Sequence, residues 1–320
     1  MIPLDHPVVS SLVPVVLLIL VGLVAGRLKL IRQESVQDLS NLVFLVLTQA
    51  LLFRTMSSVH VEQLDFRPVS LYFAVAAGLF TALLLVQGAS SRAAVIALSG
   101  TFSNTVMIGI PLVGLAYGKD ALVLLFTLIS LHALVLLTMA TVVLELLQAR
   151  EQVQSGLVPQ RHKLATIGMA IRAAVVHPVP MPIIAGLLFA QTGWALPSVV
   201  DRPLLLLGNA FGPVALVLVG VTLSQAAIGR ELKSALAIAG VKTLLHPLLM
   251  ALVGWAFGLR GASLTVLVVA ASLPIGANVF LFAHRYQKAQ DLVTASVAVS
   301  TLVALVSVTL VMTLVPYIAG

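Results

Sequence analysis

Ten runs of about twenty mostly apolar residues, separated by polar connections, dominate this chain of 320 residues. A helix needs about 20 apolar residues to cross the hydrocarbon core of a bilayer, so each run is long enough for one transmembrane helix. Only 9% of the residues are charged, which is too few to cover the surface of a soluble protein of this length. The sequence therefore predicts an all-α membrane protein embedded in a lipid bilayer. The runs are 8–26, 36–54, 68–88, 93–118, 120–147, 173–192, 203–225, 234–257, 262–284 and 291–316.

Lysine and arginine are distributed unevenly over the connections, which orients the predicted helices. With the N-terminus outside, twelve basic residues fall on the inner side: Arg27, Lys29, Arg32, Arg92, Arg150, Arg161, Lys163, Arg172, Arg230, Lys233, Arg285 and Lys288. Five fall on the outer side: Arg54, Arg67, Lys119, Arg202 and Arg260. Because cytoplasmic loops carry the excess of Lys and Arg, we expect a multi-pass protein of the cell membrane (inner or plasma) with both termini non-cytoplasmic. The same bias accounts for the net charge of +7 without a nucleic-acid partner.

The longest polar connection divides the ten runs five against five. It covers 148–172 and separates a first half, 1–147, from a second half, 173–320. Since five is an odd number, two similar halves must insert with opposite orientations, as in the inverted repeats of many secondary transporters. Pro14 and Gly22 in the first run have counterparts in the sixth, Pro178 and Gly186, and both pairs are separated by the same number of residues. The sequence predicts two inverted five-helix repeats joined by a cytoplasmic linker.

Two short polar triplets predict tight turns between consecutive helices. Gly-Lys-Asp at 118–120 ends the fourth run, and Asp-Arg-Pro at 201–203 opens the seventh. Glycine and proline beside charged residues are typical of turns. We expect hairpins between antiparallel helices at both triplets.

Helix-breaking residues interrupt the fourth and ninth runs near their midpoints, in the segments GTFSNTVMIGIPLVGLAYGK (100–119) and AASLPIGANVFLFAHRYQK (270–288). In lipid, the backbone groups freed by a break have no water to bond, so a break survives only where it faces protein or a wet cavity. Interrupted helices present amide N–H groups and positive dipole ends to which an anion can bind. For either segment alone, a kink that only shapes packing is the alternative. The candidate substrate-binding residues are Ser103, Asn104, Thr105, Gly109, Pro111, Pro274, Ile275, Gly276 and Asn278.

These same residues carry a resemblance to a known family. SNTVMIGIPL followed by AYG, together with SLPIGANVF, resembles the auxin efflux carrier family. That family includes plant PIN auxin exporters and bacterial carriers, some of them assigned to malonate or malate. The resemblance covers nearly the whole chain, including the ten runs and a short central loop.

The resemblance implies a fold like that of bile-acid sodium symporters, in which helices four and nine are unwound and cross at the substrate site. One helical bundle there moves against a scaffold in an elevator-like motion. In PIN proteins an Asn in the same sequence context contacts the substrate carboxylate, and the matching residue is Asn104. By the same resemblance, Pro111 and Pro274 mark the crossing.

One position departs from the family pattern. Relatives often open the sixth helix with Asn-Pro, whereas this chain has His177-Pro178. If that Asn contacts substrate, His177 replaces it and adds a group that titrates near neutral pH. An interfacial histidine near the helix start is the alternative.

Three ionisable residues, His132, Lys242 and His246, fall well inside predicted spans, where such groups are expensive and usually face protein or a cavity. Lys242 in the eighth run either attracts the substrate carboxylate, pairs with Glu145, or extends its side chain to the membrane interface. His132 in the fifth run either relays protons or serves as a hydrogen-bonded structural residue. Lys242 and His132 are candidates for an electrostatic or coupling role.

Enzyme signatures are missing from the sequence. There is no phosphate-binding loop followed by Lys-Ser/Thr and no HExxH, and cysteine is absent, so we expect neither catalysis nor a metal or other cofactor. Acidic residues that would hold Na⁺ are scarce in the spans, which favours uniport or proton coupling. The prediction is a secondary carrier for a small organic anion, such as a malonate-like or auxin-like carboxylate. A membrane channel or a non-transporting receptor is the alternative, although no ring of charge or polar stripe typical of a channel is evident.

The first run also contains a small-xxx-small pattern, Gly22 to Gly26. This pattern allows two helices to approach closely, either within the chain or in a homodimer. We favour packing within the chain, and a homodimer remains the other interpretation.

Overall fold

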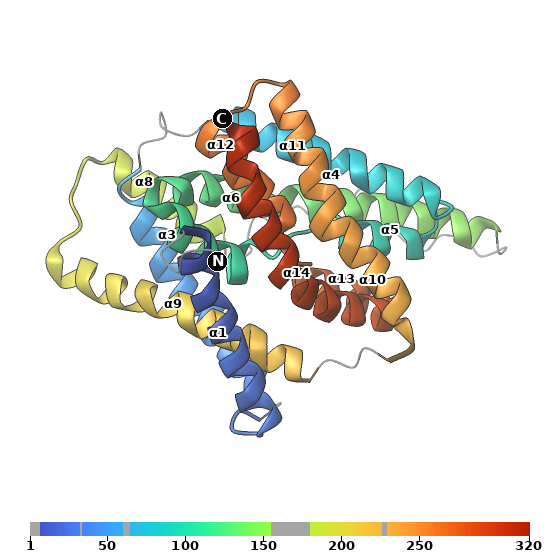
Figure 1. The fold of residues 1–320 in the computed structure, drawn as a ribbon, viewed down its shortest axis with the longest axis horizontal. Coiled ribbons are helices and arrows are strands. Elements are labelled where there is room, and N and C mark those ends of the chain that lie inside the picture. The colour runs from blue at the N-terminus through green and yellow to red at the C-terminus, as the bar shows by residue number, and fades with distance from the viewer. Residues whose placement is uncertain (1–6, 33, 60–64, 155–179, 226–228) are drawn as a thin grey trace. The chain divides into compact units, whose positions relative to one another are not determined.

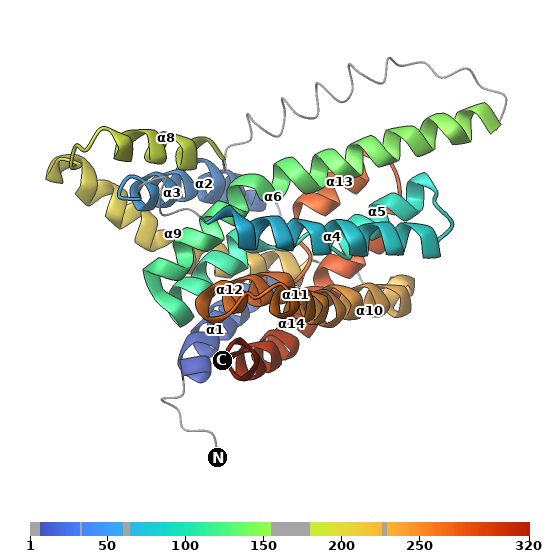
Figure 2. The same ribbon diagram turned by 90° about the horizontal axis from the view of Figure 1, so that it is seen from above.

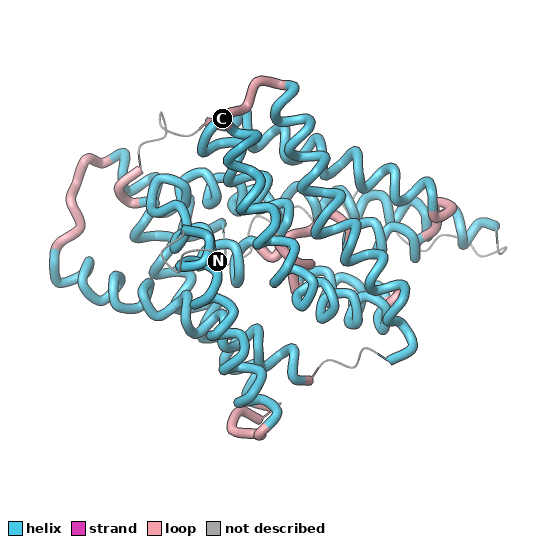
Figure 3. Tube along the Cα trace, in the orientation of Figure 1, coloured by secondary structure: helices cyan, strands magenta, loops and turns pink. Residues whose placement is uncertain are grey.

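The computed structural model describes residues 7–32, 34–59, 65–154, 180–225 and 229–320, and these consist of helices and their connections (Figure 3). Three shorter apolar helices accompany six segments that are long and apolar enough to cross a membrane. The all-α prediction is confirmed for the described residues, and a membrane protein fits these helices. The six long segments are Ser35–Met56, Phe66–Val86, Thr105–Gln154, Ser198–Ser224, Gly229–Ala256 and Gln290–Ala319.

The chain forms two compact units, and each draws on both halves of the sequence. The first unit is drawn from Met1–Phe66, Thr105–Ser130 and His177–Ala226. The second is drawn from Arg67–Asn104, Leu131–Val176 and Ala227–Gly320. The units therefore do not follow the division of the chain into 1–147 and 173–320.

In the first unit, one helix and one helix of three consecutive segments pack on a long central helix, and a further helix packs on the segmented one. The described helices are α1 (Pro7–Arg27), α2 (Ser35–Leu42), the π-helical turn η1 (Val43–Leu47), α3 (Thr48–Met56), the π-helical turn η3 (Thr105–Gly109), the first part of α6 (Ile110–Gln154), α8 (Pro180–Gln191) and α9 (Ser198–Ser224). α2, η1 and α3 follow one another without a break. α9 contacts α1, α3 and η1, and α3 also contacts α8.

The contact between α1 and α9 brings two backbones together. A Cβ atom on Gly22 would lie 1.9 Å from the Val217 carbonyl oxygen, and one on Gly220 would lie 1.9 Å from that of Ile19. Only glycine fits at both positions. The small-residue pattern of the first run is therefore used for packing within the chain.

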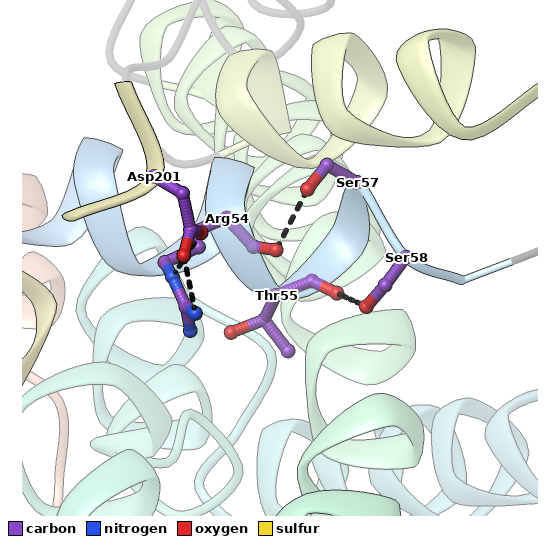
Figure 4. A network of polar contacts seen from close by, with 5 residues as sticks. All are labelled: Arg54, Thr55, Ser57, Ser58 and Asp201. Carbon is purple, nitrogen blue, oxygen red and sulfur yellow. Dashed lines mark hydrogen bonds and ion pairs between the residues drawn. The ribbon is translucent and has the colours of Figure 1, made fainter. Parts of the chain in front are cut away.

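An ion pair joins α3 to the start of α9 (Figure 4). Arg54 Nε and Nη2 donate to the two carboxylate oxygens of Asp201 at 2.7 and 3.1 Å. Asp201 lies in the first turn of α9, so the turn predicted at 201–203 is wrong, and the connection lies in residues 192–197. A carboxylate in the first turn of a helix is stabilised by the helix dipole, and here it marks a helix start rather than a loop.

The second unit contains the remaining helices. They are α4 (Phe66–Val86), α5 (Ser91–Ser99), the later part of α6 (Ile110–Gln154), the short 3₁₀ turn η4 (Gly229–Glu231), α10 (Leu232–Gly240), the π-helical turn η5 (Val241–Leu245), α11 (His246–Ala256), α12 (Gly261–Ser272), α13 (Asn278–Tyr286) and α14 (Gln290–Ala319). α10, η5 and α11 form one rod that lies beside α14 (Figures 1 and 2). α14 also contacts α12, α13 and α5.

Helix α6 is broken at Gly118, whose φ of 75° and ψ of −164° are not helical. This conformation is open to glycine and strained for other residues, and it lies at the turn predicted for 118–120. At its other end α6 continues to Gln154, so the first residues of the predicted linker 148–172 are helical, while 155–172 lie outside the described residues. Glu151 in this helical extension accepts hydrogen bonds from the Ser91 amide (2.7 Å) and hydroxyl (2.8 Å) at the start of α5.

Candidate functional site

Two helices of the second unit end where the sequence carries its helix breakers. α5 ends at Ser99, and residues 100–104 are non-helical before the π-helical turn η3 (Thr105–Gly109) leads into α6. α12 ends at Ser272, and residues 273–277 are non-helical before α13 begins. We call these two non-helical segments, 100–104 and 273–277, the paired break.

The two segments of the paired break are hydrogen-bonded to each other. The Asn104 amide donates to the Pro274 carbonyl at 2.8 Å, and the Gly276 amide donates to the Phe102 carbonyl at 3.0 Å. An unsatisfied backbone group in a bilayer costs several kcal/mol, and these bonds satisfy four of the groups that the interruptions release. The pairing explains how both helices can be broken in an apolar environment.

A third backbone group in the paired break bonds to α14. Ser103 and Ile275 lie opposite each other in antiparallel register, and the Ile275 amide donates to Ser300 Oγ at 3.1 Å. Ser300 is fully buried on α14. The break is therefore held from two sides within its own unit.

These bonds change which groups can receive an anion. The amides of Asn104, Ile275 and Gly276, which were expected to be available, donate within the protein. The Ala277 and Asn278 amides at the start of α13 have no partner in the part of the chain that the structure describes. Asn104 and Asn278 are half-buried, whereas their neighbours Ser103, Pro274, Ile275 and Gly276 are buried. Asn104 and Asn278 are thus the more exposed polar residues beside the paired break, and the first amides of α13 are donors without a partner among the described residues.

The other sequence-predicted residues of the fourth run belong to the first unit. Thr105 and Gly109 are the first and last residues of η3, and Pro111 is the second residue of α6. Pro111 therefore does not mark the interruption, and only Pro274 does. A proline is tolerated in the first turn of a helix because the N–H it lacks has no obligatory partner there. His177 lies outside the described residues.

Lys242 is fully buried in η5 of the second unit. Its Nζ donates to the carbonyl oxygens of Ala271 at 2.5 Å and Leu273 at 2.7 Å, at the C-terminal end of α12. The interpretation in which this side chain reaches the membrane interface is therefore wrong. The pairing with Glu145 is also not made, because the contacts of Lys242 Nζ in the described residues are these two carbonyl oxygens.

Three further buried polar side chains lie beside this region, and no sequence pattern groups them. The Tyr72 hydroxyl lies 2.9 Å from Ser103 Oγ, and the Tyr72 ring centroid lies 6.0 Å from that of His132 and 5.5 Å from that of His246. His132 Nε2 and both ring nitrogens of His246 have no hydrogen-bond partner among the described residues. Tyr72 was missed because a single tyrosine in an apolar run resembles a packing residue. Its hydroxyl, which needs a partner when buried, was the available signal.

Comparison with known proteins agrees with this architecture. The model of a family described as membrane transport protein matches residues 7–312. A protein of Rhizobium meliloti (strain 1021) named "Putative malonate transporter" is 28% identical over 302 residues, covering 91% of this chain and 91% of the relative. Auxin efflux carrier component 8 of Arabidopsis thaliana is 22% identical over 239 residues, covering 63% and 65%. An uncharacterized transporter of Methanothermobacter thermautotrophicus is 27% identical over 141 residues, covering 44% and 46%.

The family match spans nearly the whole chain, and the relatives are transporters rather than enzymes. The resemblance to auxin efflux carriers, which SNTVMIGIPL and SLPIGANVF indicate, is confirmed. On this ground the chain belongs to the membrane transport protein family.

Proposed function

We propose that this protein is a secondary carrier that moves a small organic anion, a mono- or dicarboxylate, across the cell membrane. The observation that carries the proposal is the paired break with neutral polar groups beside it: the half-buried Asn104 and Asn278 side chains and the first amides of α13. Such donors, at the positive end of a helix dipole, bind a carboxylate without the cost of burying a full positive charge. Interrupted helices at the substrate site recur in secondary transporters.

The relatives support a carboxylate as the substrate. One is named as a malonate transporter and another as an auxin efflux carrier. A malonate-like substrate carries two carboxylates and an auxin-like substrate carries one on an apolar body, so the feature that they share is a carboxylate. A site that recognises the carboxylate through a few neutral donors is compatible with either.

The proposal includes ten membrane-spanning helices arranged as two inverted five-helix repeats, with both termini non-cytoplasmic. Transport follows an elevator-type alternating-access mechanism, in which the second unit carries the substrate because it holds the paired break. The division of the chain into two compact units, each drawn from both halves, supports this mechanism. A homodimer is compatible with it.

Within the site, Asn104 and Asn278 bind the carboxylate, and Ser103, Pro274, Ile275 and Gly276 form the backbone that holds them. Thr105, Gly109 and Pro111 follow Asn104 along the chain and complete the fourth predicted helix. His177 opens the sixth predicted helix in place of the Asn of relatives.

The test is uptake of radiolabelled malonate into proteoliposomes that contain the purified protein. We expect Asn104→Ala to weaken the apparent affinity for malonate roughly 10- to 100-fold, because a hydrogen bond to a charged group contributes about 1.5–3 kcal/mol. Asn209→Ala is the matched control, since Asn209 is exposed on α9. Wild-type uptake by Asn104→Ala would exclude the site.

The same preparation separates a carrier from a channel or receptor. A carrier gives flux that saturates with malonate and shows counterflow, in which external substrate drives labelled substrate in the opposite direction. Non-saturating flux would identify a channel, and binding without flux would identify a receptor.

A further inference from the structure

The hydrogen bonds of Lys242 match those of a neutral amine. Its side chain is fully buried and has two acceptors, the carbonyls of Ala271 and Leu273. An ammonium group has three N–H donors, whereas a neutral amine has two N–H donors and a lone pair. The two carbonyls accept both N–H bonds of the neutral amine and leave its lone pair open to a proton, whereas one N–H of the ammonium has no acceptor among the described residues.

Among the described residues, no carboxylate is in position to balance a charge on Lys242. The elements packed against η5 are α10, α11, α12 and α14. Their titratable side chains are Lys233, His246, Asp291 and Tyr317, and all but His246 are exposed. From α4 and α6 the facing groups are Tyr72 and His132. Among the described residues, the buried polar side chains include no Asp or Glu.

The end of α12 compensates a positive charge only in part. The carbonyl end of a helix carries about half of an elementary charge. Burial of an ion without full compensation costs several kcal/mol. A protonated Lys242 therefore needs a further negative group, and the substrate anion is a negative group that binds close to the same segment.

Lys242 and the anion-binding donors act on one short stretch of chain. Leu273, which accepts a hydrogen bond from Lys242, is the first residue of segment 273–277 of the paired break, and Asn278 directly follows that segment. A positive charge on Lys242 therefore acts on a carbonyl that lies a few residues before the donors at Ala277 and Asn278. Protonation of the lysine and binding of the anion stabilise each other.

We propose that Lys242 binds a proton that is transported together with the anion, so that the carrier is a proton symporter. This inference rests on the function proposed above and names its coupling ion. On the loading side a proton from water adds to the lone pair of Lys242 Nζ as the anion binds. On the other side that N–H bond breaks, and the proton returns to water as the anion leaves.

Buried titratable side chains beside the paired break are further groups that can exchange a proton. Ser103 in the paired break is hydrogen-bonded to Tyr72, whose ring lies beside His132 and His246. His246 follows Lys242 by four residues and so lies on the same face of the helical rod. The unpartnered ring nitrogens of both histidines can accept and donate a proton.

The first test measures malonate binding to the full-length purified protein between about pH 7 and pH 9, where both carboxyl groups of malonate are ionised. If one proton binds with each anion, the Kd rises by up to about tenfold per pH unit. Lys242→Met should remove this slope, because its side chain fills similar space and binds no proton. Lys233→Met, an exposed lysine on α10, is the matched control and should keep the slope.

The second test counts protons in proteoliposomes with a pH-sensitive dye in the lumen and the membrane potential clamped. Inward malonate flux should acidify the lumen with about one proton per malonate. In Lys242→Met the ratio should fall toward zero. Lys242→Arg keeps a charge that cannot dissociate, and it should also carry no proton.

The outcomes separate this inference from the proposed function. Saturable malonate flux without lumen acidification in the wild-type protein overturns the proton symport and leaves the carrier intact. An unchanged ratio of protons to malonate in either Lys242 variant shows that another group carries the proton, and this result also overturns the role of Lys242. Absence of saturable flux for every carboxylate tested overturns the proposed function itself. If neither variant folds, as judged by thermal unfolding, the wild-type protein tests the proton symport. A Kd for malonate that does not change with pH, or a proton ratio near zero, overturns it.

Discussion

Replacing Gly276 by alanine should force the two segments of the paired break apart. A Cβ atom at this position would lie 2.8 Å from Phe102 Cδ1 and 3.0 Å from the Ser103 carbonyl oxygen. Ordinary van der Waals contact begins at 3.4 Å. The ring must therefore move by about 0.6 Å and the carbonyl by about 0.4 Å, for which we expect the destabilisation typical of overpacking.

Neither neighbour can move freely. The Phe102 ring packs edge-on against His132, with ring centroids 4.4 Å apart, and the Phe102 carbonyl accepts the hydrogen bond of the Gly276 amide. Gly276 has a negative φ, so alanine suffers no conformational strain there and the effect is purely steric. Inserting a methyl group into such a packed region costs about 1–3 kcal/mol.

The assay is thermal unfolding of the purified protein in detergent, followed by malonate uptake in proteoliposomes. For Gly276→Ala we expect the Tm to fall by roughly 3–10 °C. Uptake should fall at least about tenfold, because displacements of this size misplace binding groups. Gly78→Ala is the matched control: Gly78 lies inside α4, where a Cβ meets nothing within 4 Å, so the Tm should hold or rise. A Gly276→Ala protein with wild-type Tm and uptake would refute the steric reasoning.

Two further predictions concern the first unit. Gly220→Ala should destabilise more than Gly276→Ala, by about 3 kcal/mol or more, because its Cβ would meet the backbone oxygen of Ile19 at 1.9 Å and neither helix backbone can give way; a Tm equal to wild type would contradict the close contact. Arg54→Ala should cost only about 0.5–1 kcal/mol, since the side chains of Arg54 and Asp201 are 29% and 34% exposed and water screens their attraction. The Tm difference should shrink at high salt, and a salt-independent loss would point to packing instead of charge.

The interruption of the ninth run could be predicted because its cause is local. Pro274 lacks a backbone donor, and its position inside an apolar run is enough to predict a break there. Pro111 has the same chemistry but lies in the first turn of α6, seven residues beyond Asn104. In the fourth run the break falls at 100–104, where Phe102 and Asn104 pair with the other segment. That pairing is a long-range interaction, and no local pattern encodes it.

The prediction of a turn at 201–203 was wrong for a related reason. Asp201 and Pro203 are common in turns, but both are also common near a helix start, where the missing N–H and the negative charge are tolerated or favoured. The partner that favours the helix is Arg54, more than a hundred residues earlier in the chain. A charged residue at the edge of an apolar run can therefore belong to a turn or to a helix start, and tertiary contacts decide which of the two forms.

The environment of Lys242 lies furthest from what a sequence can reveal. A lysine two turns inside an apolar run has an inexpensive alternative, since its long side chain can reach the interface. What prevents this is the end of α12, whose carbonyls accept both hydrogen bonds of Nζ. Only the position of α12 beside η5 brings them together.

A lysine that gains its charge only together with the anion fits a carrier better than a permanent cation would. A carrier must cross the membrane both loaded and empty, and a charge that crosses alone works against the membrane potential at about 2.3 kcal/mol per 100 mV. With a proton on Lys242, a bound monocarboxylate adds no net charge to the second unit, and without either ligand the neutral amine adds none. A fixed arginine would balance the loaded unit equally well but would leave the empty unit charged, with its guanidinium buried and unpaired. The two carbonyl acceptors of Lys242 fit this requirement because they are enough for the amine and too few for the ammonium.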